Sequence, residues 1–439
     1  MNRKMISKID TESESSEASD NETSYLSALM SNLLPKSGQQ TPTPISTLPP
    51  PTLSDKKPTE CRLDFIKNIL KGNKLKPMID FETLDTETAN NTKLNKKIMD
   101  VRDLVAPTNV KLRYLKSGTT GHIFKAVNKS DKTISFAVKV SAYPKGDFYG
   151  GISNAARPEN AEIRILQLLS QFVVKRSSPH FVLPLATFNT SITNFIKVPK
   201  KMVDLKDKNS KSYREFIQNY LEGHFENFVS VLVTEWCNGG DLLDYIRKNY
   251  FTMKLRDWRV IFFQILYTLA KIQEKYPTFR HNDLKANNIF VQLTNEDDYP
   301  DKNNQYCYTI GDVRFYIPNI NLQIKISDFD FSCIDGVVEN NKVNSDWTHK
   351  INITKQENKY YDVHYFFNTL ITKRFFEQFY EGGAPPKIVE FIHRIIPEKF
   401  RNGSKYINKK CRIQVNTEYI TPLEIIRNDP LFNKYRFYN

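Results

Sequence analysis

The sequence predicts an α+β protein with two lobes, a β-rich one followed by an α-rich one, behind a disordered N-terminal tail. Strand-like runs concentrate between Val110 and Trp236, and helical periodicity dominates after Trp236. A β-rich half followed by an α-rich half favours two lobes with a cleft between them. The length of 439 residues would by itself suggest two or three domains.

Composition excludes several classes of protein. Hydrophobic residues make up 40% of the chain, too many for a wholly disordered protein, and 15 glycines without a period exclude a collagen-like chain. The five cysteines form no C-x-x-C pair, which predicts reduced thiols and no zinc site. The most apolar stretch, Val260–Ala270, is too short to span a membrane and predicts a buried helix. No secretory signal is visible at the N-terminus.

The net charge of +14 belongs to the part of the chain that folds. The first 60 residues hold six basic and eight acidic residues, so the rest of the chain must carry +16. Such a surface could attract nucleic acid or an anionic membrane. The lysines are scattered, however, and no stripe of arginine and aromatic residues appears, which favours a solvated surface.

Four regions follow from composition and pattern. We expect a disordered acidic and proline-rich tail at 1–58, a helical extension at 59–108, a β-rich lobe at 109–238 and an α-rich lobe at 239–439. Polar insertions are expected at 189–228 and 294–321, the second as a hairpin. Within the extension, Cys61–Leu75 has nearly helical apolar spacing, and we expect it to dock on its own domain.

The expected elements can be placed from periodicity. Strands are predicted at Val110–Lys116, Ile123–Asn128, Ile134–Tyr143, Phe181–Phe188 and Val229–Trp236. Helices are predicted at Pro158–Gln171, Asp241–Tyr250, Leu255–Lys275, Tyr360–Phe379 and Pro386–Ile396.

Two carboxylate-bearing segments in the α-rich half suggest phosphate chemistry. Arg280–Phe290 reads RHNDLKANNIF, in which Asp283 could accept a hydroxyl proton and Asn288, five residues later, could hold a metal. Forty residues on, Asp328 ends the apolar run IKISD, where a carboxylate could coordinate Mg²⁺ that bridges phosphates.

The β-rich half supplies complementary groups. Gly118 and Gly121 lie in a hairpin whose backbone could approach a triphosphate closely. Lys139, in FAVK at a strand end, could neutralise phosphate charge if an acid held it in place. Glu162, on the helix predicted over Pro158–Gln171, is the candidate acid.

Five motifs in this order resemble the eukaryotic protein kinase family, from about Val110 to Phe432. The resemblance implies that Asp283 is the catalytic base, that Lys285 contacts the γ-phosphate and that Asn288 and Asp328 are magnesium ligands. It implies ATP as the phosphate donor, with Mg²⁺, or Mn²⁺ as an alternative. The residues implied to bind ATP are Gly118, Gly121, Ile123, Ala137, Lys139, Glu162, Glu235, Cys237 and Asp241.

Several positions depart from the family pattern. Asn282 replaces the arginine that reads an activation-loop phosphate, and Asp330 replaces the glycine of DFG. We expect Asp330 to face solvent on a turn, and His122 on the glycine loop to be exposed. Lys116 replaces the first glycine of the phosphate loop, and no APE motif is present. Asp362, in YYDVHYFF, matches the aspartate that braces the catalytic loop.

The run ISDFDFSCIDG, the insertion before it and NKYYDVHYFFNTL together resemble the late virion serine/threonine kinases of poxviruses and related large cytoplasmic DNA viruses. This resemblance implies a protein kinase that acts on serine and threonine in virion assembly, in the cytoplasmic viral factory and in the virion. We expect a monomer. Two alternatives remain. One is a small-molecule phosphotransferase of the same fold, which Asn282 and Asp330 would suit, and the other is a pseudokinase scaffold.

Overall fold

The computed structural model describes residues 58–71, 75–79, 92–118, 121–146, 149–199, 202–294 and 305–438. Its β-rich lobe is a five-stranded antiparallel sheet in the order β1-β2-β3-β5-β4. The strands are β1 (Val110–Ser117), β2 (His122–Asn128), β3 (Ser135–Pro144), β4 (Pro184–Ser191) and β5 (Phe225–Glu235). The surrounding helices are α3 (Pro58–Leu70), α4 (Arg102–Val105), α5 (Pro158–Val174), α6 (Thr193–Ile196), η2 (Lys208–Ser210) and α7 (Lys211–Leu221).

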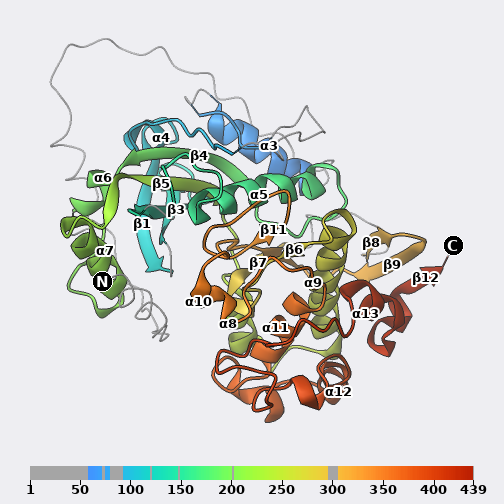
Figure 1. Cartoon of the computed structure of the whole chain (residues 1–439). Helices are drawn as coiled ribbons and strands as arrows, with labels where there is room; N and C mark the ends of the chain where they lie inside the picture. The colour runs from blue at the N-terminus through green and yellow to red at the C-terminus, as the bar shows by residue number, and fades with distance from the viewer. Residues whose placement is uncertain are drawn as a thin grey trace, which may run out of the picture.

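The α-rich lobe follows β5 and lies below the sheet in Figure 1. Its α-helices are α8 (Leu242–Asn249), α9 (Leu255–Lys275), α10 (Asp346–His349), α11 (Tyr361–Leu370), α12 (Pro386–Ile395) and α13 (Pro422–Asn428). Its 3₁₀ turns are η3 (Ala286–Asn288), η5 (Glu377–Tyr380), η6 (Glu398–Phe400) and η7 (Pro430–Tyr435). Its strands are β6 (Phe279–Arg280), β7 (Ile289–Leu293), β8 (Gln305–Ile310), β9 (Val313–Pro318), β10 (Leu322–Ile326), β11 (Cys333–Ile334) and β12 (Arg436–Tyr438). The two-lobed α+β architecture predicted from the sequence is confirmed.

Helix α9 is the centre of the α-rich lobe. Its residues are buried on nearly every side, including the polar Gln264 and Thr268 that interrupt the apolar run. Gln264 donates to the carbonyl of Leu322 at 3.2 Å and accepts from the amide of Ile324 at 2.8 Å. A buried amide is tolerated when its hydrogen bonds are satisfied, so Gln264 fixes α9 against β10. The prediction of a buried helix is confirmed, and no helix in the described ranges is long and apolar enough to cross a membrane.

Helix α5 contacts β4 and carries Glu162, which accepts from Lys139 on β3. Pro158 stands at its first position, where the missing amide hydrogen costs no helical bond. Arg157, fully buried just before it, donates to the carbonyls of Gly150 and Pro144 and lies over the ring of Tyr143. These contacts fix the start of α5 against the sheet.

The N-terminal extension docks on the β-rich lobe, as expected. Ile66 and Leu70 of α3 are buried in the main hydrophobic core, and α3 contacts α5. Farther on, the extension forms isolated bridges at Lys93 with Asn154 and at Ile98 with Asn189. The expected disordered tail lies, apart from Pro58, outside the described residues.

Two other segments differ from or add detail to the predicted elements. The helix predicted over Tyr360–Phe379 was too long, because α11 ends at Leu370. The hydroxyl of Thr372 donates to the carbonyl of Asn368 at 2.7 Å and helps to close the helix. The segment between β4 and β5 contains α6, η2 and α7. The segment before β10 contains the β8–β9 hairpin, and β9 also pairs with β12, so that it is the central strand of a three-stranded sheet.

Candidate active site

Lys139, on β3, meets two carboxylates from other elements. Its Nζ lies 2.8 and 2.9 Å from the two side-chain oxygens of Glu162 on α5, and 3.2 Å from Oδ1 of Asp328 after β10. Burial would lower the pKa of Lys139, but the charges of Glu162 and Asp328 raise it instead. The Glu162 side chain is 7% exposed and that of Asp328 is 44% exposed. The structure therefore joins both lobes through a charged cluster that is open on the Asp328 side.

Asp362 on α11 holds the backbone of the loop that carries Asp283. Oδ2 of Asp362 accepts the amide hydrogen of His281 at 2.7 Å, and Oδ1 accepts that of Asn282 at 2.9 Å. Asn282 has a backbone φ of +63° and Asp328 one of +62°, in the left-handed region that residues other than glycine rarely adopt. Such strain is held only where the surroundings fix it, and it concentrates at functional sites.

Asn282 uses neutral hydrogen bonds where the family pattern has an arginine. It is fully buried, and its Nδ2 donates to the carbonyls of Phe331 at 3.0 Å and Thr354 at 3.1 Å. These bonds tie the Asp283 loop directly to the segment that follows Asp328. No phosphate is needed to make this connection.

Both oxygens of the Asp283 carboxylate have partners. Oδ2 lies 3.1 Å from Nζ of Lys285 and accepts from Nδ2 of Asn288 at 3.0 Å. Oδ1 accepts from Nη2 of Arg412 at 2.5 Å. Although burial would raise the pKa of Asp283, the charges of Lys285 and Arg412 lower it to about 2. The carboxylate is therefore ionised throughout the physiological pH range.

Asp330 contradicts its expected place on a solvent-facing turn. It is 5% exposed and forms an ion pair with Lys342. Asn340 donates to the carbonyls of Asp330 at 2.9 Å and Ser332 at 3.0 Å. The expectation was wrong because the chain folds back over this position between Asn340 and Lys342 and supplies a buried cation that no local pattern shows. The result is an ordered segment directly after Asp328.

The glycine hairpin between β1 and β2 lies beside β3. The amide of Gly118 donates to the carbonyl of Gly121 at 2.8 Å. A Cβ atom at Gly121 would come within 2.7 Å of Oγ of Ser141 and 3.0 Å of the carbonyl oxygen of Val140. Any other residue at this position would require Ser141 and the backbone at Val140 to shift. Behind the hairpin, Ile123 lies opposite Lys139 in the β2–β3 register.

His122 is the second contradicted expectation, because it is 7% exposed. Its ring centroid lies 4.7 Å from that of Tyr213 and 4.5 Å from that of Phe216, both on α7. Its Nδ1 lies 2.7 Å from Oγ of Ser117 on β1. The helix inserted between β4 and β5 thus packs on the glycine hairpin and covers His122, a long-range contact that the hairpin sequence does not reveal.

The strand β5 ends at Glu235, between the two lobes. Glu235 accepts from Arg62 of α3 at 2.5 and 2.9 Å and from the amide of Leu183 at 2.8 Å. Burial would raise the pKa of Glu235, but Arg62 lowers it. The backbone amide of Glu235 also donates to the carbonyl of Leu183 at 3.0 Å, so both the side chain and the amide are engaged within the protein.

The other residues assigned to the nucleotide by sequence lie around the same connection. Cys237 is buried, and burial raises the pKa of its thiol to about 12. Ala137 on β3 pairs with Thr234 on β5. Asp241 caps α8 by accepting from the amide of Asp244 at 3.0 Å, and its Oδ2 lies 3.6 Å from Nζ of Lys116.

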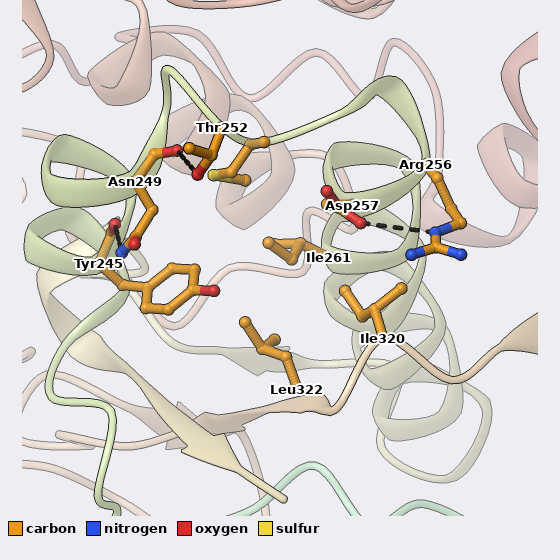
Figure 2. Close-up of a pocket in the computed structure, with 9 residues that line it drawn as sticks. Tyr245, Asn249, Thr252, Arg256, Asp257, Ile261, Ile320 and Leu322 are labelled. Carbon is orange, nitrogen blue, oxygen red and sulfur yellow. Dashed lines mark hydrogen bonds and ion pairs between the residues drawn. The ribbon is translucent and has the colours of Figure 1, made fainter. Parts of the chain in front are cut away.

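A cavity of about 240 Å³ lies on the α-rich lobe (Figure 2). Tyr245 and Asn249 of α8, Ile261 of α9 and Leu322 of β10 are among its lining residues. None of the residues that the sequence assigned to ATP, metal or catalysis lines this cavity.

Comparison with known proteins agrees with this geometry. The sequence model of the family described as poxvirus serine/threonine protein kinase matches residues 154–435. The chain belongs to this kinase family.

Similar proteins occur in Acanthamoeba polyphaga mimivirus. The "Putative serine/threonine-protein kinase R400" is 57% identical over 415 residues, which cover 94% of this chain and 86% of that protein. The "Uncharacterized protein R402" is 22% identical over 357 residues, 76% of this chain and 39% of that protein. The "Putative serine/threonine-protein kinase R301" is 42% identical over 81 residues, 18% of this chain and 20% of that protein. This protein is accordingly a serine/threonine protein kinase of a viral family, and that expectation is confirmed.

The structure of this kinase also contains site residues that the sequence did not reveal. Arg412 contacts Asp283, Lys342 contacts Asp330 and Arg62 contacts Glu235. Lys342 and Arg412 lie outside helices and strands, in segments without recognisable motifs. For Arg62 the sequence offered one weak signal. It is a charged residue in the segment Cys61–Leu75, which was expected to dock on its own domain.

Proposed function

We propose that this kinase transfers the γ-phosphate of Mg-ATP to serine and threonine hydroxyls of proteins. The observation that carries the proposal is the cluster of Lys139, Glu162 and Asp328, with Lys139 Nζ at 2.8 to 3.2 Å from both carboxylates. A buried lysine held by an acid of α5 is suited to neutralise phosphate charge. The family match supports the reaction class.

Asp283 orients the acceptor hydroxyl and accepts its proton in this proposal. Its ionised carboxylate can receive a proton, and its position on a braced loop limits the directions from which a hydroxyl can approach. Lys285, 3.1 Å from Oδ2 of Asp283, contacts the transferring phosphoryl group.

ATP binds between the lobes. The hairpin with Gly118 and Gly121 covers the phosphates, and Ile123 and Ala137 pack against the base. The adenine hydrogen-bonds to the backbone at Glu235 and Cys237, and Asp241 contacts the ribose. Two observations support this arrangement. The side chain of Glu235 is paired with Arg62 and so is not available to a ligand, and Gly121 lies close to β3.

Asn288 and Asp328 provide a donor set that fits Mg²⁺. Asn288 uses its amide hydrogens on Asp283, at 2.9 and 3.0 Å, so its carbonyl oxygen is the group left to accept a metal. Two protein oxygens are what Mg²⁺ takes when phosphates and water complete its octahedron, and Mn²⁺ accepts the same ligands. When bound, the ion would neutralise charge on the phosphates. Within the described residues, no cluster of three or more His, Cys, Asp or Glu forms a self-sufficient metal site.

Phosphate transfer from labelled ATP tests the proposal. We expect the full-length protein to label a casein-like acceptor on serine and threonine, and chelation of divalent ions to stop the reaction. Choline and an aminoglycoside serve as competing acceptors. Label on the small molecules alone would contradict the proposal, and equal transfer by the wild type and a D283A variant would indicate a scaffold without activity.

The viral family supports a second part of the proposal, that the kinase acts in the cytoplasmic viral factory during virion assembly and is packaged. We expect a monomer in solution, measurable by light scattering. Mass spectrometry of purified virions should detect the protein. Its absence from virions that contain their other packaged enzymes would contradict packaging.

A further inference from the structure

Arg412 reaches the Asp283 loop from a distant part of the chain. It lies between α12 and α13, 129 residues after Asp283, and is 5% exposed. Its Nη2 donates to Oδ1 of Asp283 at 2.5 Å. Its Nη1 donates to the backbone carbonyl of Asn282 and to the hydroxyl of Tyr361, the latter at 3.1 Å. One guanidinium therefore contacts both the backbone and the carboxylate of this loop.

The guanidinium is held in this position by its surroundings. Its carbon lies 4.0 Å from the ring centroid of Tyr365 on α11, a cation–π contact in a buried site. The residue before it, Cys411, has φ of +63°, and Nδ2 of Asn368 donates to the carbonyl of Cys411 at 3.0 Å. A planar fork with fixed donors can orient a carboxylate in a way that a flexible ammonium cannot.

The two oxygens of Asp283 consequently face different partners. Arg412 takes Oδ1, while Lys285 and Asn288 lie on the side of Oδ2. Asn282 offers no charge to the loop, because its side chain is a neutral amide, and its Nδ2 donates to two carbonyls. Arg412 thus brings a guanidinium to this loop through the tertiary structure, although it lies far from the loop in sequence.

We propose that Arg412 is a positioning residue for phosphoryl transfer, which holds Oδ1 of Asp283 so that Oδ2 faces the acceptor hydroxyl. This inference rests on the proposed function. Reacting groups displaced by about 1 Å lose on the order of 100-fold in rate, so a carboxylate free to rotate should slow transfer. ATP binding should change little, because none of the contacts of Arg412 involves a residue assigned to the nucleotide.

The test compares R412M and R412K with wild type in the full-length protein, using a casein-like acceptor. Rates are expressed per site that binds a nonhydrolysable ATP analogue, which corrects for any misfolded fraction. We expect R412M to lower kcat about 30- to 100-fold with the KM for ATP within about twofold, and R412K to recover part of the loss. The control is R394M, because Arg394 also donates to both oxygens of a carboxylate, that of Asp429 at 2.8 and 2.9 Å, elsewhere in the lobe, with a side chain that is 42% exposed.

A double-mutant cycle separates positioning from general stability. If Arg412 acts through Asp283, R412M should add little further loss to a D283N background. An unchanged kcat per ATP-binding site in R412M, a full additional loss in D283N, or an equal loss in R394M would overturn the inference. A rise in kcat would also overturn it and show an autoinhibitory contact instead. A wild-type protein that transfers no phosphate would overturn the proposed function and this inference together, whereas an active wild type with an unaffected R412M would overturn only the inference.

Discussion

Two ion pairs of the candidate active site differ in how far the sequence could reveal them. Lys139 and Glu162 are 23 residues apart on a strand and a helix with clear periodicity. Asp283 and Arg412 are 129 residues apart, and Arg412 lies in an irregular segment. The first pair belongs to the ordered motifs of the kinase pattern, while the second exists only because the segment between α12 and α13 folds against the Asp283 loop. Two ion pairs of one site therefore need not be equally predictable from the sequence.

The largest effect should come from the carboxylate of the second pair. We expect D283N to lower kcat by about 10³-fold or more, because the amide cannot accept the hydroxyl proton. The KM for ATP should stay within about threefold, as measured by initial rates. Transfer within tenfold of wild type would contradict the role proposed for Asp283.

Breaking the pair of Lys139 and Glu162 should lower catalysis less than the D283N substitution does. E162Q leaves a neutral hydrogen-bonding side chain near Lys139 but removes the charge that holds it, and Asp328 remains 3.2 Å away. We expect kcat/KM for ATP to fall about 30- to 100-fold. A loss as large as that of D283N would reverse the ranking of the two pairs.

The ion pair of Arg62 and Glu235, which shares no residue with the two pairs above, should affect stability more than catalysis. R62M leaves the largely buried carboxylate of Glu235 without its guanidinium, so we expect the free energy of unfolding to fall by about 2 kcal/mol in urea titrations. R102M removes an exposed ion pair with Asp100 and should change stability by about 0.5 kcal/mol or less. Equal effects of the two substitutions would show that α3 does not stabilise the connection between the lobes.

The smallest predicted effect concerns the glycine hairpin. S117A removes the hydroxyl that lies 2.7 Å from Nδ1 of His122. One lost hydrogen bond of about 1 kcal/mol should raise the KM for ATP roughly three- to fivefold at nearly constant kcat. T133A, on the exposed β2–β3 turn, is the control and should leave both constants unchanged. A loss in kcat would place Ser117 among the groups that act in the chemical step.

The sequence determined by itself the two-lobed α+β class, and it singled out Lys139, Glu162 and Asp328, whose side chains the structure brings together. Strand alternation, helical spacing and short motifs are local signals, so they can be read from neighbouring residues. The exposure of His122 was predicted wrongly because α7, which covers it, is distant in sequence. The exposure of Asp330 was predicted wrongly because the chain folds back and brings Lys342, 12 residues later, onto it. The overlong helix beyond Leu370 arose because an apolar run continued after the backbone had turned.

Only the tertiary structure decided which basic side chain pairs with which carboxylate. Arginine and lysine are common on protein surfaces, and a sequence does not distinguish a solvated one from one that is buried against an acid. Long-range packing brings Arg412 to Asp283 and Arg62 to Glu235, across 129 and 173 residues. The physical reason is that a buried charge must find an opposite charge in space, and its position in the chain does not restrict where that partner comes from.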